Sequence, residues 1–293
     1  MKDNNEGSTL IVAYQGERGA FSEDAARKLL GADIETMPCR TFEEMFDAVS
    51  SGAASAAAAP IENSLAGSVH KNYDLLMEHD LTITGETNLR IVHHLIAPRG
   101  VRLEDIRRVH SHPVALAQCE KFLRANPRIE VAPAYDTAGS VKMVTESNTG
   151  EDAAIAGATA ALVYGAEIIA ESIEDNAKNF TRFLLLARPD RADSVKTISH
   201  ANDKKTSIVF RVANKPGGLF RSLAAFALRD IDLTKLESRP IEGRPWEYSF
   251  YLDLIGDQLD PHVERALANL SELAESVRIL GSYWRSDQKE NEQ

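Results

Sequence analysis

Apolar and polar residues in the first part of the chain repeat with two different spacings, which predict strands and helices in turn. A short apolar run at residues 10–14 leads into a glycine-containing loop, and residues 22–30 then follow a helical spacing. Residues 41–51 again carry their apolar side chains on one helical face, with Thr41 as the predicted N-cap. Strand, loop and helix in this order are typical of an α/β fold.

The alanine-rich segment at residues 53–60 is where helix propensity and sequence context disagree. Alanine favours a helix, but the run is short, follows Gly52 and stops at a proline. We therefore predict a short buried strand with small side chains. Glu62, Asn63 and Ser64 follow it directly, at the kind of strand end where ligands bind in open α/β folds. An N-cap for the next helix is an alternative that stays open for this polar set.

A second set of strand and helix patterns follows, which predicts a two-lobed domain. Residues 81–98 alternate as an extended strand or two and form a candidate crossing between lobes, and residues 180–187 form a strand that returns. Two lobes that the chain crosses twice leave a cleft between them, a common place for a small ligand. The predicted domain spans residues 8–189, with lobe 1 at about 8–88 and 174–189 and lobe 2 at about 89–173.

The end of the chain predicts a separate module. Residues 190–203 are polar and form the predicted linker. Residues 204–286 then predict two strand–helix–strand units in the order βαββαβ, which is the ferredoxin-like arrangement.

Composition and charge narrow the function classes. The chain has 293 residues and a net charge of −11, which argues against a general nucleic-acid binder and requires a local basic pocket for any anionic substrate. Cys39 and Cys119 lie far apart without metal-ligand spacing, which indicates reduced thiols in the cytoplasm. No apolar run is long enough for a membrane span, the first residues do not resemble a targeting segment, and no histidine and carboxylate set indicates a metal site.

Two motifs at strand ends have both a functional and a structural interpretation. The glycines of Gly16-x-x-Gly19-x-x-Ser22 could present amides to an anion, or form a tight turn with Ser22 as N-cap, and the spacing leaves both open. The motif lacks the G-x-G start of the dinucleotide fingerprint. In Ser111-His112-Pro113 the N-cap interpretation of Ser111 is favoured, with Gln118 more than a turn inside the helix.

Thr181 and Arg182 stand at the head of an apolar strand, where a polar pair is unusual. Arg182 suits a bidentate pair with a substrate carboxylate. An ion pair with Glu174 or Asp175 is an alternative that the sequence leaves open.

Taken together, these segments resemble the prephenate dehydratase family along nearly the whole chain. The tail resembles an ACT domain, with GGLF at residues 217–220 and ESRP at residues 237–240 in the family's phenylalanine-sensing positions. Departures from the family pattern are small: many relatives have Gln where Val114 stands and a second Thr where Phe180 stands, and GGLF varies the commoner Gly-Ala-Leu form. The carriers of the resemblance in the first domain are VAYQGERGAFSEDAA (12–26), PIENSLAGSVHKNYDLL (60–76), SHPVALAQC (111–119), DTAGS (136–140) and NFTRFLLL (179–186).

The resemblance implies an α/β fold, with a two-lobed catalytic domain like the type II periplasmic binding proteins and a C-terminal ferredoxin-like ACT domain. It also implies an enzyme without a metal or organic cofactor, which decarboxylates and dehydrates prephenate to phenylpyruvate in L-phenylalanine biosynthesis. We expect Thr181 to donate a hydrogen bond to the departing hydroxyl group. By motif matching, the catalytic residues are Thr181, Glu62, Asn63, Ser111 and Gln118, and the substrate-binding residues are Arg182, Gly19, Ala20, Phe21, Ser22, Ser64 and Phe183.

For the C-terminal module the resemblance implies regulation by L-phenylalanine, bound between two such modules of a homodimer or homotetramer. Glycines in the sensing loop would let the backbone approach the amino acid closely. Neither nucleic acid nor membrane is an expected partner. The expected phenylalanine site comprises Gly217, Gly218, Leu219, Glu237, Ser238, Arg239 and Pro240.

Two rival functions remain. VAYQG, ENSLAGS and HKNYDLL are close to plant-type enzymes, so an arogenate dehydratase or a dual-specificity enzyme is the nearer alternative. A non-catalytic, amino-acid-responsive binding protein is the other, and the pair Thr181 and Arg182 counts against it, as do the polar residues after the alanine-rich strand.

Overall fold

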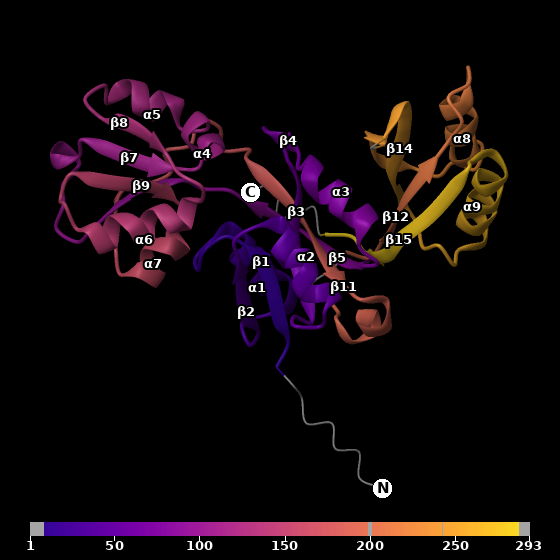
Figure 1. The fold of residues 1–293 in the computed structure, drawn as a ribbon, viewed down its shortest axis with the longest axis horizontal. Coiled ribbons are helices and arrows are strands. Elements are labelled where there is room, and N and C mark those ends of the chain that lie inside the picture. Colours follow the sequence, from indigo (N-terminus) through magenta and orange to yellow (C-terminus); the bar gives the residue numbers. More distant parts are fainter. Residues whose placement is uncertain (1–8, 199–200, 242, 287–293) are drawn as a thin grey trace, which may run out of the picture.

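The computed structural model describes residues 9–198, 201–241 and 243–286, which form two lobes and a C-terminal domain, with lobe 1 between the other two bodies (Figure 1). Residue 8, where the first domain was predicted to begin, lies outside the described residues, as do residues 199 and 200 of the predicted linker. None of the helices within these described ranges combines the length and the apolar content needed to cross a membrane.

Lobe 1 is built on a mixed sheet with the strand order β2-β1-β3-β11-β5, and β4 pairs with β3 at one end. Strand β1 runs parallel to β2 and β3, whereas β11 is antiparallel to both β3 and β5. The chain therefore leaves lobe 1 after β5 and re-enters it as a central strand. The elements are β1 (Ile11–Gln15), α1 (Phe21–Leu30), β2 (Glu35–Cys39), α2 (Phe42–Ser50), β3 (Ala56–Asn63), β4 (Gly67–Ser68), α3 (His70–Glu78), β5 (Thr82–Arg90) and β11 (Phe180–Ala187).

Lobe 2 repeats the layered arrangement around a second sheet with the order β10-β6-β9-β7-β8. Its apolar core is separate from the main core of lobe 1, because each sheet packs against its own helices. The elements are β6 (His94–Ala97), η1 (Leu103–Asp105), β7 (Arg108–Ser111), α4 (Pro113–Ala117), α5 (Glu120–Ala125), β8 (Glu130–Pro133), α6 (Thr137–Ser147), β9 (Asp152–Ala156), α7 (Ala158–Tyr164) and β10 (Glu167–Ala170).

The C-terminal domain has the predicted βαββαβ order and an antiparallel sheet with the order β13-β14-β12-β15. Its two helices pack on one face of this sheet. Apolar residues of the other face, among them Val209, Tyr251 and Leu280, share a buried cluster with lobe 1, so the domain packs directly on lobe 1. The elements are η2 (Pro189–Ser194), which precedes the domain, then β12 (Lys204–Arg211), α8 (Gly218–Ala227), β13 (Leu233–Ile241), β14 (Arg244–Ile255), α9 (Pro261–Leu273) and β15 (Ser276–Trp284).

The alanine-rich segment is a buried strand, as predicted, but the strand does not stop at Pro60. It continues to Asn63, and Pro60 lies where the register between β3 and β11 shifts. A proline has no N–H to donate, and an irregularity in the ladder is where a strand tolerates it. Consequently Glu62 and Asn63 lie within the strand and are not N-caps.

Helix starts were predicted with mixed success. The side chain of Thr41 accepts a hydrogen bond from Glu44 N, which confirms it as the N-cap of α2. Ser22 is not an N-cap, because α1 begins one residue before it, after Ala20. Ser111 is not one either, because His112 caps α4 through its side chain. The N-cap of α1 is Ala20, two residues before Ser22, and the N-cap of α4 is His112, one residue after Ser111.

Candidate active site

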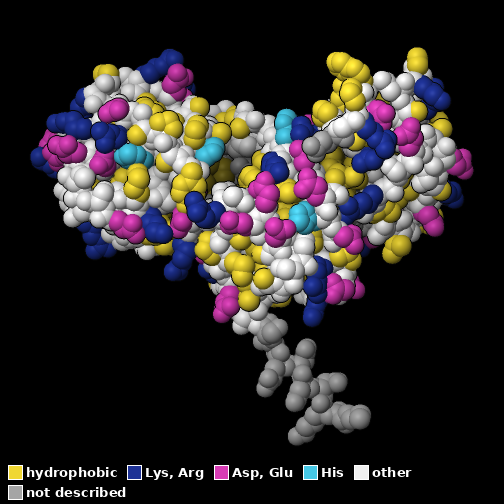
Figure 2. Space-filling view, in the orientation of Figure 1, with side chains coloured by type: hydrophobic (Ala, Val, Ile, Leu, Met, Phe, Trp, Pro, Cys, Tyr) yellow, Lys and Arg dark blue, Asp and Glu magenta, His cyan; other side chains and the backbone are white. Residues whose placement is uncertain are grey.

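A cleft of about 610 Å³ lies between the two lobes, and the space-filling view shows the hollow there (Figure 2). Lobe 1 contributes the carboxyl ends of β1 and β2 and the first turns of α1 and α2. Lobe 2 contributes α4 and the residues around the start of α6. Of the predicted site residues, those that line the cleft are Ala20, Phe21, Ser22, Asn63, Gln118, Thr181 and Phe183.

Thr181 and Asn63 face each other across the β3–β11 pair at the floor of this cleft. They are direct partners in the antiparallel register, and Asn63 Nδ2 donates a hydrogen bond of 2.9 Å to Thr181 Oγ1. Because the threonine oxygen accepts this bond, its own proton remains free to be donated elsewhere. The side chain of Thr181 is buried, so this hydroxyl group is held in a defined orientation.

The hydrogen-bond network continues from this pair into lobe 2. Asn63 Nδ2 also lies 2.8 Å from Asn179 Oδ1, and Asn179 Nδ2 donates to Gln118 Oε1 at 2.9 Å. His93 Nε2 contacts the same Gln118 oxygen at 2.9 Å. Since an amide oxygen only accepts, Nε2 carries the proton in this arrangement. The floor of the cleft is therefore a chain of neutral polar groups.

His93 belongs to the cleft lining but was not predicted as a site residue. Burial lowers the pKa of its imidazole, although Gln118 and Glu174 act in the opposite direction, so the ring is neutral at pH 7. Its ring packs edge-on against Phe21 with the centroids 5.6 Å apart. The sequence signal was weak, because the histidine lies in the crossing segment between the lobes and not at the end of a strand.

Among the described residues that line the cleft, Arg40 is the only one that is a lysine or an arginine. It follows β2 directly, at the same sheet edge as the end of β1. Together with the first turns of α1 and α2, it can attract an anion at one end of the cleft, whose lining also includes Glu43 and Asp136. On a protein with a net charge of −11, an anionic substrate requires a local basic group, and Arg40 is such a group. The strand-end rule that selected Asn63 would also have found Arg40.

Arg182 does not line the cleft, and the prediction that it anchors a substrate carboxylate is wrong. Its guanidinium group points to the other face of β11, where it binds Glu86 and Asp253. The alternative pairing with Glu174 or Asp175 is also wrong, since Arg90 is the arginine that contacts Glu174. Arg182 follows Thr181 in an extended strand, and successive side chains of a strand point to opposite faces.

Gly19 was predicted to contact the substrate, but its amide already has a partner within the protein. Its N–H donates to Glu23 Oε2 at 2.7 Å, so this amide is occupied by a carboxylate of the protein itself. Its φ angle is +83°, and a Cβ atom here would lie 2.7 Å from Ala160 Cα of lobe 2. Gly19 thus forms a tight turn that allows the two lobes to touch.

Three further predicted residues lie outside the cleft lining. Glu62 points toward the C-terminal domain and pairs with Lys235 Nζ at 3.0 Å. Ser111 is buried and donates to the carbonyl oxygen of Ile155 at 2.6 Å, which ties β7 to β9. Ser64 Oγ donates to the carbonyl oxygen of Lys178 and braces the entry to β11. Each of these side chains already has a protein partner.

The two predicted phenylalanine-sensing motifs lie apart within one chain. Gly217, Gly218 and Leu219 line a hollow of about 360 Å³ beside Trp246 and Tyr248. The ESRP residues lie on the edge strand β13, whose side chains alternate between the two faces of the sheet. Glu237 and Arg239 contact Ser68 and Asp74 of lobe 1, whereas Ser238 and Pro240 are exposed.

The fold and the cleft define the class of protein: a two-lobed α/β domain with a polar inter-lobe cleft, followed by a βαββαβ module packed on lobe 1. The family model described as prephenate dehydratase matches residues 12–191, and the model described as ACT domain matches residues 206–272. The chain belongs to the prephenate dehydratase family.

Individual proteins and solved structures are similar to the chain over most of its length. The chain is 45% identical over 288 residues to arogenate dehydratase/prephenate dehydratase 2, chloroplastic, of Arabidopsis thaliana, covering 95% of this chain and 74% of that protein. The structure of a prephenate dehydratase in complex with L-Phe, from Arthrobacter aurescens, has a TM-score of 0.84 and 33% identity, over 94% of this chain and 90% of that one. A protein described as GqqA, a novel type of quorum quenching acylase, also has a TM-score of 0.84, with 36% identity over 95% of this chain and 99% of that one.

Proposed function

We propose that this protein converts prephenate to phenylpyruvate with loss of carbon dioxide and water. The observation that supports this most directly is the hydrogen-bonded pair of Asn63 and Thr181 on the floor of the inter-lobe cleft, 2.9 Å apart. The cleft volume of about 610 Å³ is in the range of small-molecule sites. It combines a hydroxyl donor, a cationic end and apolar walls, which are the three features that this elimination requires.

Each bond change has a group to assist it. When the ring carboxylate leaves as CO₂, the electrons of its C–C bond enter the ring and complete the aromatic system, while the C–O bond on the opposite side of the ring breaks. The departing hydroxide takes a proton from solvent and leaves as water. We place Thr181 Oγ1 against this oxygen, where it stabilises the growing negative charge by donating a hydrogen bond.

The carboxylate that is not lost is placed by the positive end of the cleft, at Arg40 and the first turns of α1 and α2. The carboxylate that is lost lies against apolar walls formed by Phe21, Ile91 and Phe183. Water stabilises a carboxylate more than it stabilises CO₂, so apolar walls favour the decarboxylation. Asn63, His93 and Gln118 orient the donor without adding charge.

Regulation by L-phenylalanine, in a homodimer or homotetramer assembled through the C-terminal domain, is the second part of this proposal. It is supported by the match to the ACT model and by the hollow beside Gly217. The solved relative in complex with L-Phe supports the choice of effector. The cytoplasm is the proposed compartment, in agreement with Cys39 and Cys119, which are both free thiols, although the Arabidopsis relative is described as chloroplastic.

The decisive experiment compares prephenate and arogenate as substrates of the purified chain, with phenylpyruvate and phenylalanine measured as the respective products. We expect phenylpyruvate from prephenate, at a kcat/KM above that for arogenate. A higher kcat/KM for arogenate would make the protein an arogenate dehydratase. Binding of prephenate without either product would instead support a non-catalytic sensor.

A further inference from the structure

Strands β3 and β11 present different residues on their two faces, and the two sets are direct neighbours in sequence. Thr181 is paired with Asn63 in the ladder, and Arg182 is paired with Glu62. Since side chains alternate along a strand, Thr181 and Asn63 line the cleft while Arg182 and Glu62 contact the C-terminal domain. A single peptide unit therefore separates each cleft residue from an inter-domain contact.

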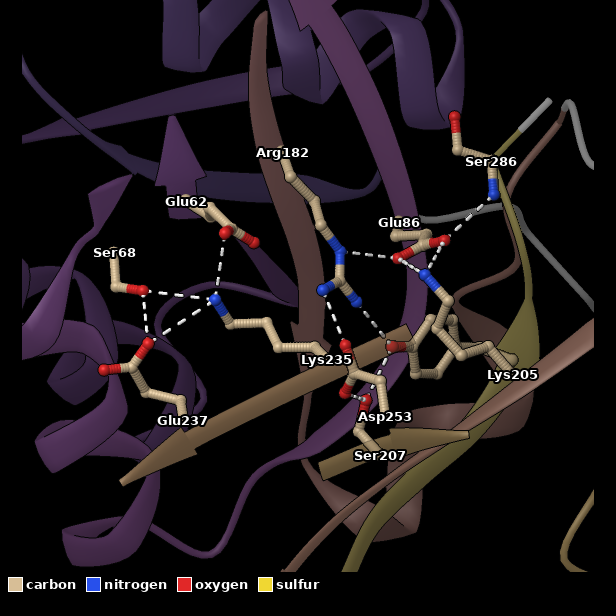
Figure 3. A network of polar contacts seen from close by, with 11 residues as sticks. Glu62, Ser68, Glu86, Arg182, Lys205, Ser207, Lys235, Glu237, Asp253 and Ser286 are labelled. Atoms are coloured by element: carbon tan, nitrogen blue, oxygen red, sulfur yellow. Dashed lines mark hydrogen bonds and ion pairs between the residues drawn. The ribbon is translucent and has the colours of Figure 1, made fainter. Parts of the chain in front are cut away.

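Arg182 is the centre of the larger of these contacts (Figure 3). Its Nε donates to Glu86 Oε2 at 2.7 Å, its Nη1 to Asp253 Oδ2 at 2.6 Å, and its Nη2 to Tyr283 Oη at 3.0 Å. Asp253 and Tyr283 belong to β14 and β15 of the C-terminal domain, whereas Glu86 lies on β5 of lobe 1. The planar guanidinium group thus holds both domains in one geometry.

The cluster around Arg182 is buried and balanced in charge. Lys205 Nζ binds Glu86 at 2.8 Å, so two cations face two carboxylates. The Glu86 side chain is only 2% exposed and that of Arg182 13%. Burial alone would raise the pKa of Asp253, but Arg182 and Lys205 lower it below its usual range, so the carboxylate stays ionised. Such a cluster resists displacement, because moving one member leaves a buried charge unpaired.

Glu62 makes the second contact, on the neighbouring strand. Its carboxylate lies 3.0 Å from Lys235 Nζ of β13, and Lys235 also lies 3.6 Å from Glu237 (Figure 3). Ser68 completes this group by donating to Glu237 at 2.6 Å. Both strands that carry the cleft pair are therefore attached to the C-terminal domain.

We propose that Arg182 and Glu62 are positioning residues, through which the C-terminal domain sets the relative placement of Thr181 and Asn63 and hence the rate of the reaction. This inference rests on the proposed function. A shift of the C-terminal domain pulls on Arg182 and Glu62 separately, because they contact different strands of its sheet. The hydrogen bond between Asn63 and Thr181 spans the same two strands, and its strength depends steeply on geometry. A misplacement of about 1 Å in a reacting group can cost about 100-fold in rate.

The test uses the full chain with Arg182→Met, Asp253→Leu and the double variant, assayed with prephenate. We expect each variant that folds to lose about tenfold in kcat, with less than about threefold change in KM, because neither residue lines the cleft. The double variant should lose no more than either single variant, since both act through the same contact. It also removes one cation and one carboxylate together, which keeps the cluster neutral and allows it to fold even where a single variant does not.

Arg278→Met is the matched control. Arg278 of β15 also joins the C-terminal domain to lobe 1, by donating to the carbonyl oxygen of His79 at 2.9 Å, but it contacts the end of α3 and neither β3 nor β11. We expect its kcat to stay within about twofold of the unmodified protein. A folded double variant with unchanged kcat would overturn the inference, and so would an equal loss in Arg278→Met. Absence of prephenate turnover in the unmodified protein would refute the proposed function instead.

Discussion

The two faces of the β3–β11 pair carry different kinds of polar group: neutral groups on one face and charged groups on the other. On the cleft face, Asn63 and Thr181 belong to a network of neutral amides, hydroxyl and imidazole. On the other face, Arg182 and Glu62 belong to ion pairs with the C-terminal domain. The neutral network can turn a donor toward a ligand without competing for the ligand's charge. The ionic network instead holds two domains together, and its buried members depend on one another.

Burial therefore places different demands on the two networks. Neutral groups need only a hydrogen-bond partner to be buried at modest cost. A buried carboxylate needs a cation, because the desolvation of an unpaired charge costs several kcal/mol. We therefore expect the charged face to dominate stability and the neutral face to dominate the rate. The following predictions test that division in order of expected effect.

Glu86→Gln should have the largest effect on stability. The change leaves Arg182 and Lys205 facing a neutral group in a buried site, and breaking a buried pair in this way typically costs about 3–5 kcal/mol. We expect Tm to fall by roughly 10 °C. Arg102→Ala is the control, because the pair of Arg102 and Glu104 is exposed and should contribute less than about 1 kcal/mol. Equal shifts for the two variants in a thermal melt would remove the contrast between buried and surface charge.

Thr181→Ala should have the largest effect on the rate and little effect on stability. It removes the hydroxyl group that accepts from Asn63 and that we propose donates to the leaving oxygen. The loss of such a donor typically costs about 2.7–4 kcal/mol of barrier, or about 100- to 1000-fold in kcat. Thr181→Ser keeps the hydroxyl group and should retain most of the activity. Near-normal turnover of prephenate by the alanine variant would exclude the proposed role.

Asp24→Asn tests a half-buried carboxylate whose pKa is raised although Arg27 acts to lower it. Asp24 of α1 accepts from Thr159 of lobe 2, and burial raises the pKa of its carboxyl group to about 6. A raised carboxyl pKa means that the folded state holds the proton more tightly than the unfolded state. Stability is therefore lost as pH rises from about 4 to about 6, and the cost is complete above that range.

We expect Asp24→Asn to be more stable than the unmodified protein at pH 7.5, by about 1 kcal/mol after screening by solvent, and equally stable near pH 4. Melting temperatures across this pH range provide the measurement. A variant that is less stable at pH 7.5 would show that the Asp24 carboxylate is stabilised by its surroundings, as Asp253 is.

Much of the fold follows from local patterns. The strand at Phe180–Ala187 has the predicted bounds, and helices α1 and α2 lie within one residue of the predicted ranges 22–30 and 41–51, because the apolar spacing of these segments is clear. The start of α4 was misjudged because His112 and Ser111 are both able to cap, and the local sequence does not choose between them. The continuation of β3 through Pro60 depends on a register shift with a strand that is more than 100 residues away in sequence.

The local sequence is also insufficient to define the candidate site. The motifs that contain Asn63 and Thr181 mark these residues at strand ends, and alternation alone separates them from Glu62 and Arg182. Alternation does not indicate which face of the strands forms a cleft and which face is covered by a second domain. Arg182 has the chemistry of a carboxylate anchor on either face.

The sequence by itself thus determined the order of elements, the two-lobed domain followed by a βαββαβ module, and the polar residues at the strand ends. Only the tertiary structure decided that Thr181 lines the cleft and that Arg182 holds the C-terminal domain. The physical reason is that a strand's pattern records the polarity of its two faces, whereas the partner of each face comes from distant segments such as Gln118 and Asp253.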